Sequence, residues 1–158
     1  MTPSSDRTAP LYIVLIAHPL MMASVAVLIL NDHVLKAHWP GFLTGKLSDA
    51  AGLVFFPVLL AALSGVVLRR AKGVALLVAC ALITAVVFAW IKIDPTGTAF
   101  YRHALAVLQW PWRAAMAFVH GHGLPGVRPV VAVTDPTDAW MLPFATLSPW
   151  LGWRYSGN

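Results

Sequence analysis

The sequence predicts an all-α fold, a polytopic transmembrane helical bundle of four spans with one interfacial amphipathic helix. Composition gives the first indication, since 59% of the 158 residues are hydrophobic and only 11% are charged, whereas soluble domains carry about 25% charged residues. Long runs at 11–30, 50–68 and 73–91 contain no Asp, Glu, Lys or Arg. Each is about 28 to 30 Å long as a helix, which matches a hydrocarbon core of about 30 Å. We therefore expect residues 1–158 to form a single integral membrane domain.

The first and last spans need separate justification. The run at 11–30 is longer than the roughly 7 to 15 apolar residues of a secretory signal, so we expect a retained anchor. It carries His18 and Pro19 near its middle, and a proline is tolerated in a membrane helix when neighbours satisfy the freed carbonyl. The last span, 139–155, is about 25 Å long as a helix. Aromatic residues bracket it, as is typical of segments that end at the two membrane interfaces.

The orientation follows from basic residues between the second and third spans. Arg69, Arg70 and Lys72 form the one cluster of basic side chains in the sequence. The positive-inside rule places this turn, and with it the N-terminus, in the cytoplasm. The net charge of +5 does not indicate nucleic-acid binding, because the other basic residues are scattered. We expect a multi-pass protein of the inner cell membrane.

An amphipathic helix is expected at 96–119. At 100° per residue its polar side chains, Arg102, Gln109, Arg113 and His120, lie within about 20° of one line. Such a helix either lies in the interface with this amphipathic stripe toward water, or spans with the stripe turned into the bundle. Spanning would bury two arginines at about 2.5 to 3.5 kcal/mol each near the bilayer centre. Because no acidic residue offsets them within 96–116, we favour the interfacial helix, with a fifth span as the alternative.

The tripeptide Asp-Pro-Thr occurs twice, at 94–96 and at 135–137. An aspartate caps the free amides of a first helical turn, and a proline at the first helical position loses no hydrogen bond. Each tripeptide therefore predicts the start of a helix. Asp138 falls in the first turn of the second helix, where negative charge also suits the helix dipole.

A second polar feature is the stretch LTGKLSDAAG at 43–52, directly before an apolar run. With Thr44 as its N-cap, the helix presents Lys46 and Asp49 on one face, three residues apart and close enough to pair. They form either an interfacial ion pair that ends a span or a polar site, since ionisable groups at membrane depth indicate function. In the four-span layout the outer ends of the helices bring together a candidate polar site of Lys46, Asp49, Asp135, Asp138 and His33.

These residues resemble the layout of VanZ-like membrane proteins. In that family a Lys and a His three residues later begin the second span, and two Asp three apart, followed by Asn and Gly, begin the last. Here Lys46 begins the second span and the pair of aspartates at 135–138 begins the last, so the resemblance covers 46–152. Asp49 stands where the family has His, and no Asn follows in the last span. Two phrases, LTGKLSDAAGLVFFP and TDPTDAW, are also similar to uncharacterised bacterial membrane proteins.

The resemblance implies a multi-pass topology in a bacterial inner membrane and an association with glycopeptide resistance. From the residues themselves, the first functional hypothesis is a site that binds or acts on an envelope lipid or a peptidoglycan precursor. A Lys beside several carboxylates can bind phosphate or shift a carboxylate pKa toward acid–base work. No motif for a named reaction accompanies it, so an enzymatic activity is left open.

Two alternatives come from other classes of protein. A metal site is one, built from imidazole and carboxylate ligands at His33, His38, Asp32 and Asp49, or at His120 and His122. The other is a small non-enzymatic scaffold or accessory subunit, because the sequence has no recognisable catalytic motif. We expect no cofactor and no nucleic-acid partner; the expected partner is the lipid bilayer, with an envelope lipid or precursor as ligand.

Overall fold

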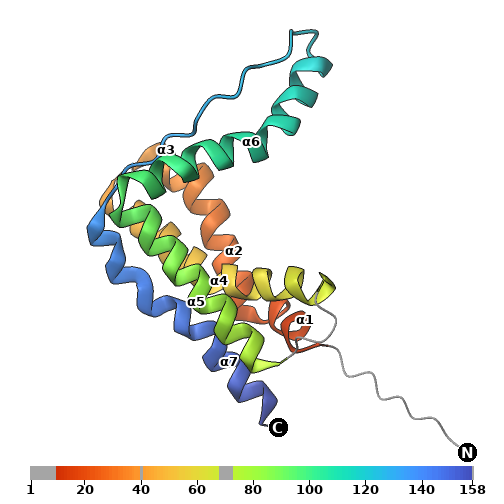
Figure 1. The fold of residues 1–158 in the computed structure, drawn as a ribbon, viewed down its shortest axis with the longest axis vertical. Coiled ribbons are helices and arrows are strands. Elements are labelled where there is room, and N and C mark those ends of the chain that lie inside the picture. The colour runs from red at the N-terminus through yellow and green to blue at the C-terminus, as the bar shows by residue number, and fades with distance from the viewer. Residues whose placement is uncertain (1–9, 40, 68–72, 158) are drawn as a thin grey trace, which may run out of the picture. The chain divides into compact units, whose positions relative to one another are not determined.

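The computed structural model describes residues 10–39, 41–67 and 73–157. These residues form helices and connecting segments, with no strand in the described part of the chain. The elements follow one another in the order shown in Figure 1: α1 (Leu11–Ile16), α2 (Pro19–Leu30), the π-helical turn η1 (Asn31–Leu35), α3 (Lys36–His38), α4 (Phe42–Val67), α5 (Val74–Ile93), α6 (Pro95–Val119), the 3-10 helix η2 (Pro136–Thr146) and α7 (Leu147–Ser156).

Three segments are long and apolar enough to cross a membrane: Pro19–His38 with 20 residues, Phe42–Val67 with 26 and Val74–Ile93 with 20. The all-helical prediction is therefore confirmed, and the chain has the helices of a membrane protein. The predicted fourth span, 139–155, is divided between η2 and α7 and is not among the three. The four-span count stays a prediction.

Two predictions concern residues outside the described part of the chain. The second predicted span ends there, at Leu68. The whole basic cluster of Arg69, Arg70 and Lys72, from which we predicted the orientation, also lies there. The cytoplasmic N-terminus consequently also stays a prediction.

The first predicted span is broken near its N-terminal end. α1 ends at Ile16 and α2 begins at Pro19, because a proline cannot donate the backbone hydrogen bond that would continue the helix. His18 lies between them as the N-cap, and its Nδ1 accepts a hydrogen bond from the Leu20 amide at 3.1 Å. The expectation that one continuous helix contains the His-Pro pair is therefore wrong. The long segment that can span begins at Pro19 and continues through η1 to His38.

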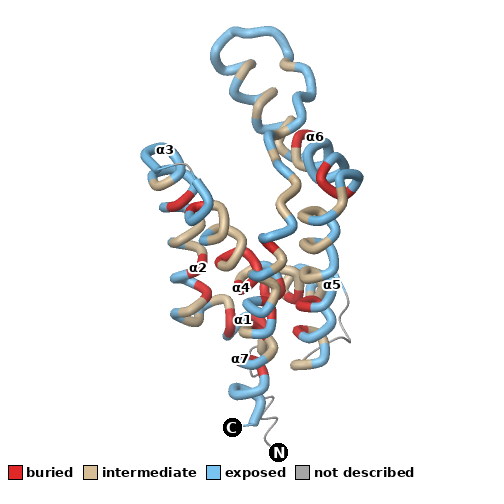
Figure 2. Tube along the Cα trace, turned by 90° about the vertical axis from the view of Figure 1, so that its left-hand side faces the viewer, coloured by how far each residue is buried: buried red, intermediate tan, exposed pale blue. Residues whose placement is uncertain are grey.

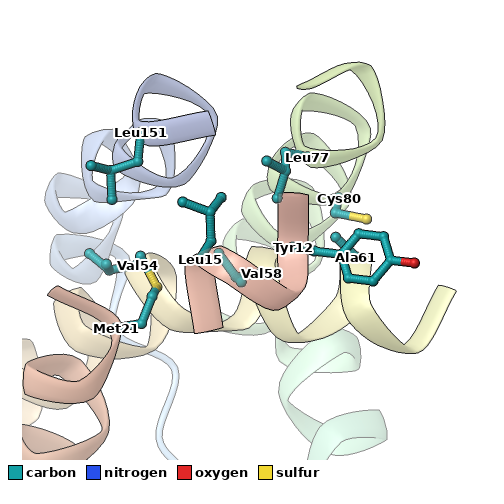
Figure 3. Close-up of a cluster of buried hydrophobic side chains, with 9 residues drawn as sticks. All are labelled: Tyr12, Leu15, Met21, Val54, Val58, Ala61, Leu77, Cys80 and Leu151. Carbon is teal, nitrogen blue, oxygen red and sulfur yellow. The ribbon is translucent and has the colours of Figure 1, made fainter. Parts of the chain in front are cut away.

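The chain divides into two compact units. The first comprises the described residues up to Val86 together with those from Trp140 onward, and the second is Val87–Ala139. The core of the first unit is formed by apolar side chains from α1, α2, α4, α5 and α7, which Figure 3 shows: Tyr12, Leu15, Met21, Val54, Val58, Ala61, Leu77, Cys80 and Leu151.

α7 packs onto the first unit through a hydrogen bond and a close contact. The buried Ser148 hydroxyl donates to the Val54 carbonyl of α4 at 2.5 Å. At Gly152 an added Cβ would lie 2.5 Å from the Leu77 side chain of α5. A small residue and a hydroxyl thus hold α7 against α4 and α5.

The second unit consists of the end of α5, α6, and the irregular segment 122–135 that follows. α6 begins directly after α5: Asp94 caps it, and the Thr98 hydroxyl donates to the Ile91 carbonyl at 2.6 Å. Gly97 is required at this crossing, because a Cβ there would collide with the Trp90 carbonyl oxygen. Figure 2 shows most of α6 and of the following segment as exposed or half-buried.

Candidate functional site

The most buried polar side chain of the first unit is Asn31, at the junction of α2 and η1. It is fully buried, and its Nδ2 donates to two acceptors of α4, the Thr44 carbonyl and the Ser48 hydroxyl, each at 2.6 Å. Both amide hydrogens are thereby used. The Asn31 Oδ1 atom is also buried and has no hydrogen-bond partner among the described residues. A buried acceptor without a donor costs about 1 to 3 kcal/mol, so it marks a position where a donor is needed.

The hydrogen bonds continue from Ser48 to an ion pair. The Ser48 hydroxyl donates to Asp32 Oδ1 at 2.9 Å, and Lys36 Nζ donates to the same oxygen at 2.6 Å. The order of donors is therefore fixed from the Asn31 amide through Ser48 to the carboxylate. Both members of the ion pair are exposed. This polar end of the first unit combines a buried amide with solvent-accessible charges.

The backbone of η1 places these side chains. The Lys36 amide donates to the Asn31 carbonyl, five residues back, which is the π-helical pattern. A π-helical turn holds one more residue than an α-helical turn, and such turns occur frequently at functional sites. Asn31 and Asp32, adjacent in sequence, both reach Ser48 of α4 across this turn.

Of the predicted site residues, Lys46, Asp49 and His33 lie in the first unit. α4 begins at Phe42, two residues before the predicted cap Thr44, so Lys46 and Asp49 lie inside the helix and not at its first turn. Both are half-buried. The Lys46 amine lies 4.2 Å from the centre of the Phe42 ring, a cation–π contact within its own helix. His33 is exposed, and its Nδ1 lies 3.0 Å from the Ile29 carbonyl.

The other two predicted site residues, Asp135 and Asp138, lie in the second unit at the start of η2. Asp135 accepts hydrogen bonds from the Thr137 amide at 2.9 Å and from its hydroxyl at 2.7 Å. The helix start predicted from Asp135-Pro136 is therefore confirmed, as is the one at Asp94, which accepts from the Thr96 and Gly97 amides.

Asp138 makes an ion pair that the sequence did not reveal. Its carboxylate accepts from the Lys92 amine at 2.6 Å, across 46 residues of chain. The Lys92 side chain is 20% exposed and that of Asp138 is 9% exposed, so the pair is largely shielded from solvent. It joins the end of α5 to the start of η2 within the second unit. The joining of residues of both units into one polar site stays a prediction.

The amphipathic stripe lies on α6, whose bounds match the predicted helix 96–119 within one residue. Arg113 donates to the Gln109 side chain at 2.9 Å, and Arg102 Nε donates to the Val130 carbonyl at 2.9 Å. His120 follows the last residue of α6, with its Nδ1 2.7 Å from the Met116 carbonyl. The stripe is thus engaged with polar groups of its own unit.

Metal ligation finds no support in the part of the chain that the structure describes. No group of three or more His, Cys, Asp or Glu side chains there is arranged to hold a metal ion. The rings of His120 and His122, predicted as one possible pair of ligands, have centroids 6.4 Å apart.

Comparisons with protein-family models, with curated proteins and with solved structures give no match for this chain. The class of protein therefore rests on the fold: an all-helical chain with three helices long and apolar enough to cross a bilayer. The resemblance to VanZ-like proteins stays a prediction.

Proposed function

We propose that this chain is a four-span bacterial inner-membrane protein that binds the headgroup of an envelope lipid or a lipid-linked peptidoglycan precursor. The binding groups are the polar residues at the outer ends of its helices, Lys46, Asp49, Asp135, Asp138 and His33. The N-terminus is cytoplasmic in this proposal. The observation that carries the proposal is the shielded Lys92–Asp138 ion pair, where the Asp138 side chain is only 9% exposed.

The energetics of such a pair support a binding role. The cost of removing two charges from water equals or exceeds their mutual attraction, so a shielded ion pair is a poor means of stabilising a fold. In a chain with only 11% charged residues, an ionisable pair beside an apolar helix is a functional hypothesis by default. Amines bind phosphate groups, and carboxylates accept hydrogen bonds from the hydroxyl and amide groups of a headgroup.

The orphaned acceptor in the first unit supports the same ligand chemistry. The buried Asn31 Oδ1 atom lacks a donor among the described residues. A sugar hydroxyl or a peptide N–H, as found on a peptidoglycan precursor, supplies such a donor. The polar side chains of the chain therefore include amines for phosphate and acceptors for hydroxyl or amide hydrogens.

The binding test uses lipids retained by the purified protein. The full chain is extracted from bacterial membranes in a mild detergent, and native mass spectrometry identifies the bound lipids. We expect an isoprenoid-linked or phospholipid ligand on the wild type and its loss in Asp138→Asn. Asp94→Asn, which changes an exposed cap carboxylate, is the matched control and should retain the ligand. Retention of the ligand by Asp138→Asn, or no ligand on the wild type, contradicts the proposal.

The topology is tested independently with a reporter fused after residue 158. Four spans with a cytoplasmic N-terminus place this reporter in the cytoplasm. A periplasmic reporter signal would require an odd number of spans and would contradict the arrangement.

A second candidate function is a non-enzymatic membrane scaffold or accessory subunit. It is favoured by the Ser148–Val54 hydrogen bond and the Lys92–Asp138 pair, because each ties elements that are far apart in sequence. In that case the purified wild type should carry no specific lipid, because Asp138→Asn lowers the stability of the fold under either function.

A further inference from the structure

α6 and the segment 122–135 form a hairpin, which we call the α6 hairpin. The segment leaves the end of α6 and runs back along it toward its start, as Figure 1 shows. Side-chain hydrogen bonds join the two arms along their length: Trp110 Nε1 to the Pro125 carbonyl at 2.8 Å, Arg102 Nε to the Val130 carbonyl at 2.9 Å, and the Thr98 and Thr134 hydroxyls at 2.9 Å. The Val130 amide also donates to the Arg102 carbonyl at 3.3 Å.

The two sides of α6 differ in what covers them. At 100° per residue, the side chains that bond to the returning segment lie on the side of the amphipathic stripe. The opposite side carries large apolar side chains that the described residues leave exposed, Phe100 at 62%, Val107 at 60%, Leu108 at 76% and Phe118 at 81%, and Trp112 at 70% and Val119 at 76% lie at its edge.

The returning segment limits how the hairpin meets a bilayer. Residues 122–135 form neither helix nor strand, so their amides and carbonyls lack regular partners. Irregular backbone does not occur exposed to lipid within the hydrocarbon region, because each unsatisfied group costs several kcal/mol. The hairpin therefore lies along the membrane surface, with the returning segment on the water side and the apolar side of α6 toward the acyl chains.

The positive charge of the hairpin favours a membrane surface that carries negative charge. Residues 95–134 contain three arginines, Arg102, Arg113 and Arg128, and no Asp or Glu. Among the described residues none of the three forms an ion pair with a carboxylate. Arg102 donates a side-chain hydrogen bond to a carbonyl oxygen and Arg113 one to an amide oxygen, whereas a guanidinium has five N–H donors. Most of the N–H donors of these arginines are therefore left for an anionic ligand.

We propose that the α6 hairpin is a binding surface for anionic lipid headgroups, with the apolar side of α6 in the acyl-chain boundary and the three arginines on headgroup phosphates. The three arginines and the apolar side of α6 include no residue of the proposed ligand site, whose Asp135 ends the returning segment, so failure of this proposal leaves that site untouched. Each arginine near an anionic surface contributes about five-fold in lipid affinity, the equivalent of about 1 kcal/mol.

The first test measures which lipid the hairpin selects. The full chain is reconstituted into nanodiscs of phosphatidylcholine with or without phosphatidylglycerol, and native mass spectrometry counts the phosphatidylglycerol molecules retained after release. Arg128→Gln should weaken retention about five-fold, and the triple replacement of all three arginines about 100-fold. The matched control, Arg154→Gln in α7, removes one exposed arginine outside the hairpin and should leave retention unchanged. Equal retention by Arg128→Gln and Arg154→Gln overturns the proposal.

The second test places the two sides of α6 relative to the bilayer. A fluorophore on Leu108→Cys, in a Cys80→Ala background, should be quenched by lipids with a nitroxide on the acyl chain. The adjacent Gln109→Cys, on the stripe side, should be quenched by a water-soluble agent instead. Equal quenching of the two positions overturns the proposal. So does efficient disulfide cross-linking of Leu108→Cys between copies, because a second chain would then cover the apolar side.

Discussion

Replacing Lys92 by Met removes one member of the largely shielded ion pair with Asp138. The Asp138 carboxylate, 9% exposed, loses the amine that lies 2.6 Å away. Breaking a buried pair from one side costs about 3 to 5 kcal/mol, because the remaining charge is held away from water. The 20% exposure of Lys92 lets water approach, so we take the lower end. A loss of about 3 kcal/mol lowers the ratio of folded to unfolded protein more than 100-fold.

The chain contains a matched control for this measurement. Lys36 and Asp32 form a second Lys–Asp pair with the same 2.6 Å separation, but their side chains are 41% and 47% exposed. Such an exposed pair on one helix contributes about 0.3 to 0.5 kcal/mol. Lys36→Met should therefore cost several-fold less than Lys92→Met, although the residue types and the distance are the same.

The assay is reversible unfolding of the full chain in detergent micelles, followed by tryptophan fluorescence. The exchange variant, Lys92→Asp with Asp138→Lys, should recover at least half of the stability lost in Lys92→Met, since it restores the pair. If Lys92→Met costs no more than Lys36→Met, then shielding does not set the strength of the pair, and the argument from burial fails.

The other predictions concern a close contact, a buried hydrogen bond and a cap. Gly97→Ala should destabilise the protein by about 1 to 3 kcal/mol, because the added Cβ would collide with the Trp90 carbonyl. Thermal unfolding measures this loss against Gly126→Ala, where an added Cβ has nothing within 4 Å. Ser148→Ala should cost about 1 kcal/mol in chemical unfolding, since the Val54 carbonyl loses its buried donor. The Thr96 hydroxyl, with the Thr96 and Gly97 amides, lowers the pKa of Asp94. The stability that this cap contributes should be complete above the ordinary pKa of an aspartate, and it should be lost as the pH falls through the lowered pKa of Asp94. Unfolding midpoints measured between pH 6 and pH 2 check this.

Each of these three predictions is compared with a matched variant or with the wild type. Equal effects of Gly97→Ala and Gly126→Ala would show that the crossing of α5 and α6 can relax. Ser156→Ala removes an exposed hydroxyl that donates to the Trp153 carbonyl. It should change the free energy of unfolding much less than Ser148→Ala does. Asp94→Asn should show a smaller decline in stability at low pH than the wild type; an unchanged decline would mean that other carboxyl groups cause it.

Local signals predicted some elements well. The bounds of α6 followed from the Asp94-Pro95 cap and the polar stripe, because both act within one helix. The start of α4 was placed too late, because Thr44 was expected to be its N-cap, whereas the helix begins at Phe42 and Thr44 lies inside it. The break before Pro19 was missed because tolerance of proline in a membrane helix was assumed, whereas here the helix ends and begins again.

The candidate site was predicted less completely, for two physical reasons. Lys92 and Asp138 are 46 residues apart, and a pair at that distance is created by tertiary packing that no local pattern encodes. Asn31 carries no charge, so a search for ionisable groups passed over it. The sequence feature that indicates Asn31 is a single side-chain amide at the end of an apolar run. Such an amide needs hydrogen-bond partners when it is buried. Ser48 and Thr44 supply these partners from the polar stretch 43–52.

The π-helical turn η1 makes the length of this segment as important as its residues. An α-helix advances 100° for each residue, so deleting one residue between Asp32 and Lys36 would rotate the following turn by about that angle. Asn31 and Asp32 would keep their bonds to Ser48 of α4, but the side chains after the deletion, Lys36 among them, would move to other faces of their helix, and the ion pair with Asp32 would lose its present geometry. Every chemical group would still be there, yet the ion pair at the end of the hydrogen-bonded chain would no longer be held in place. A single-residue deletion in this turn is therefore expected to do more damage than most substitutions.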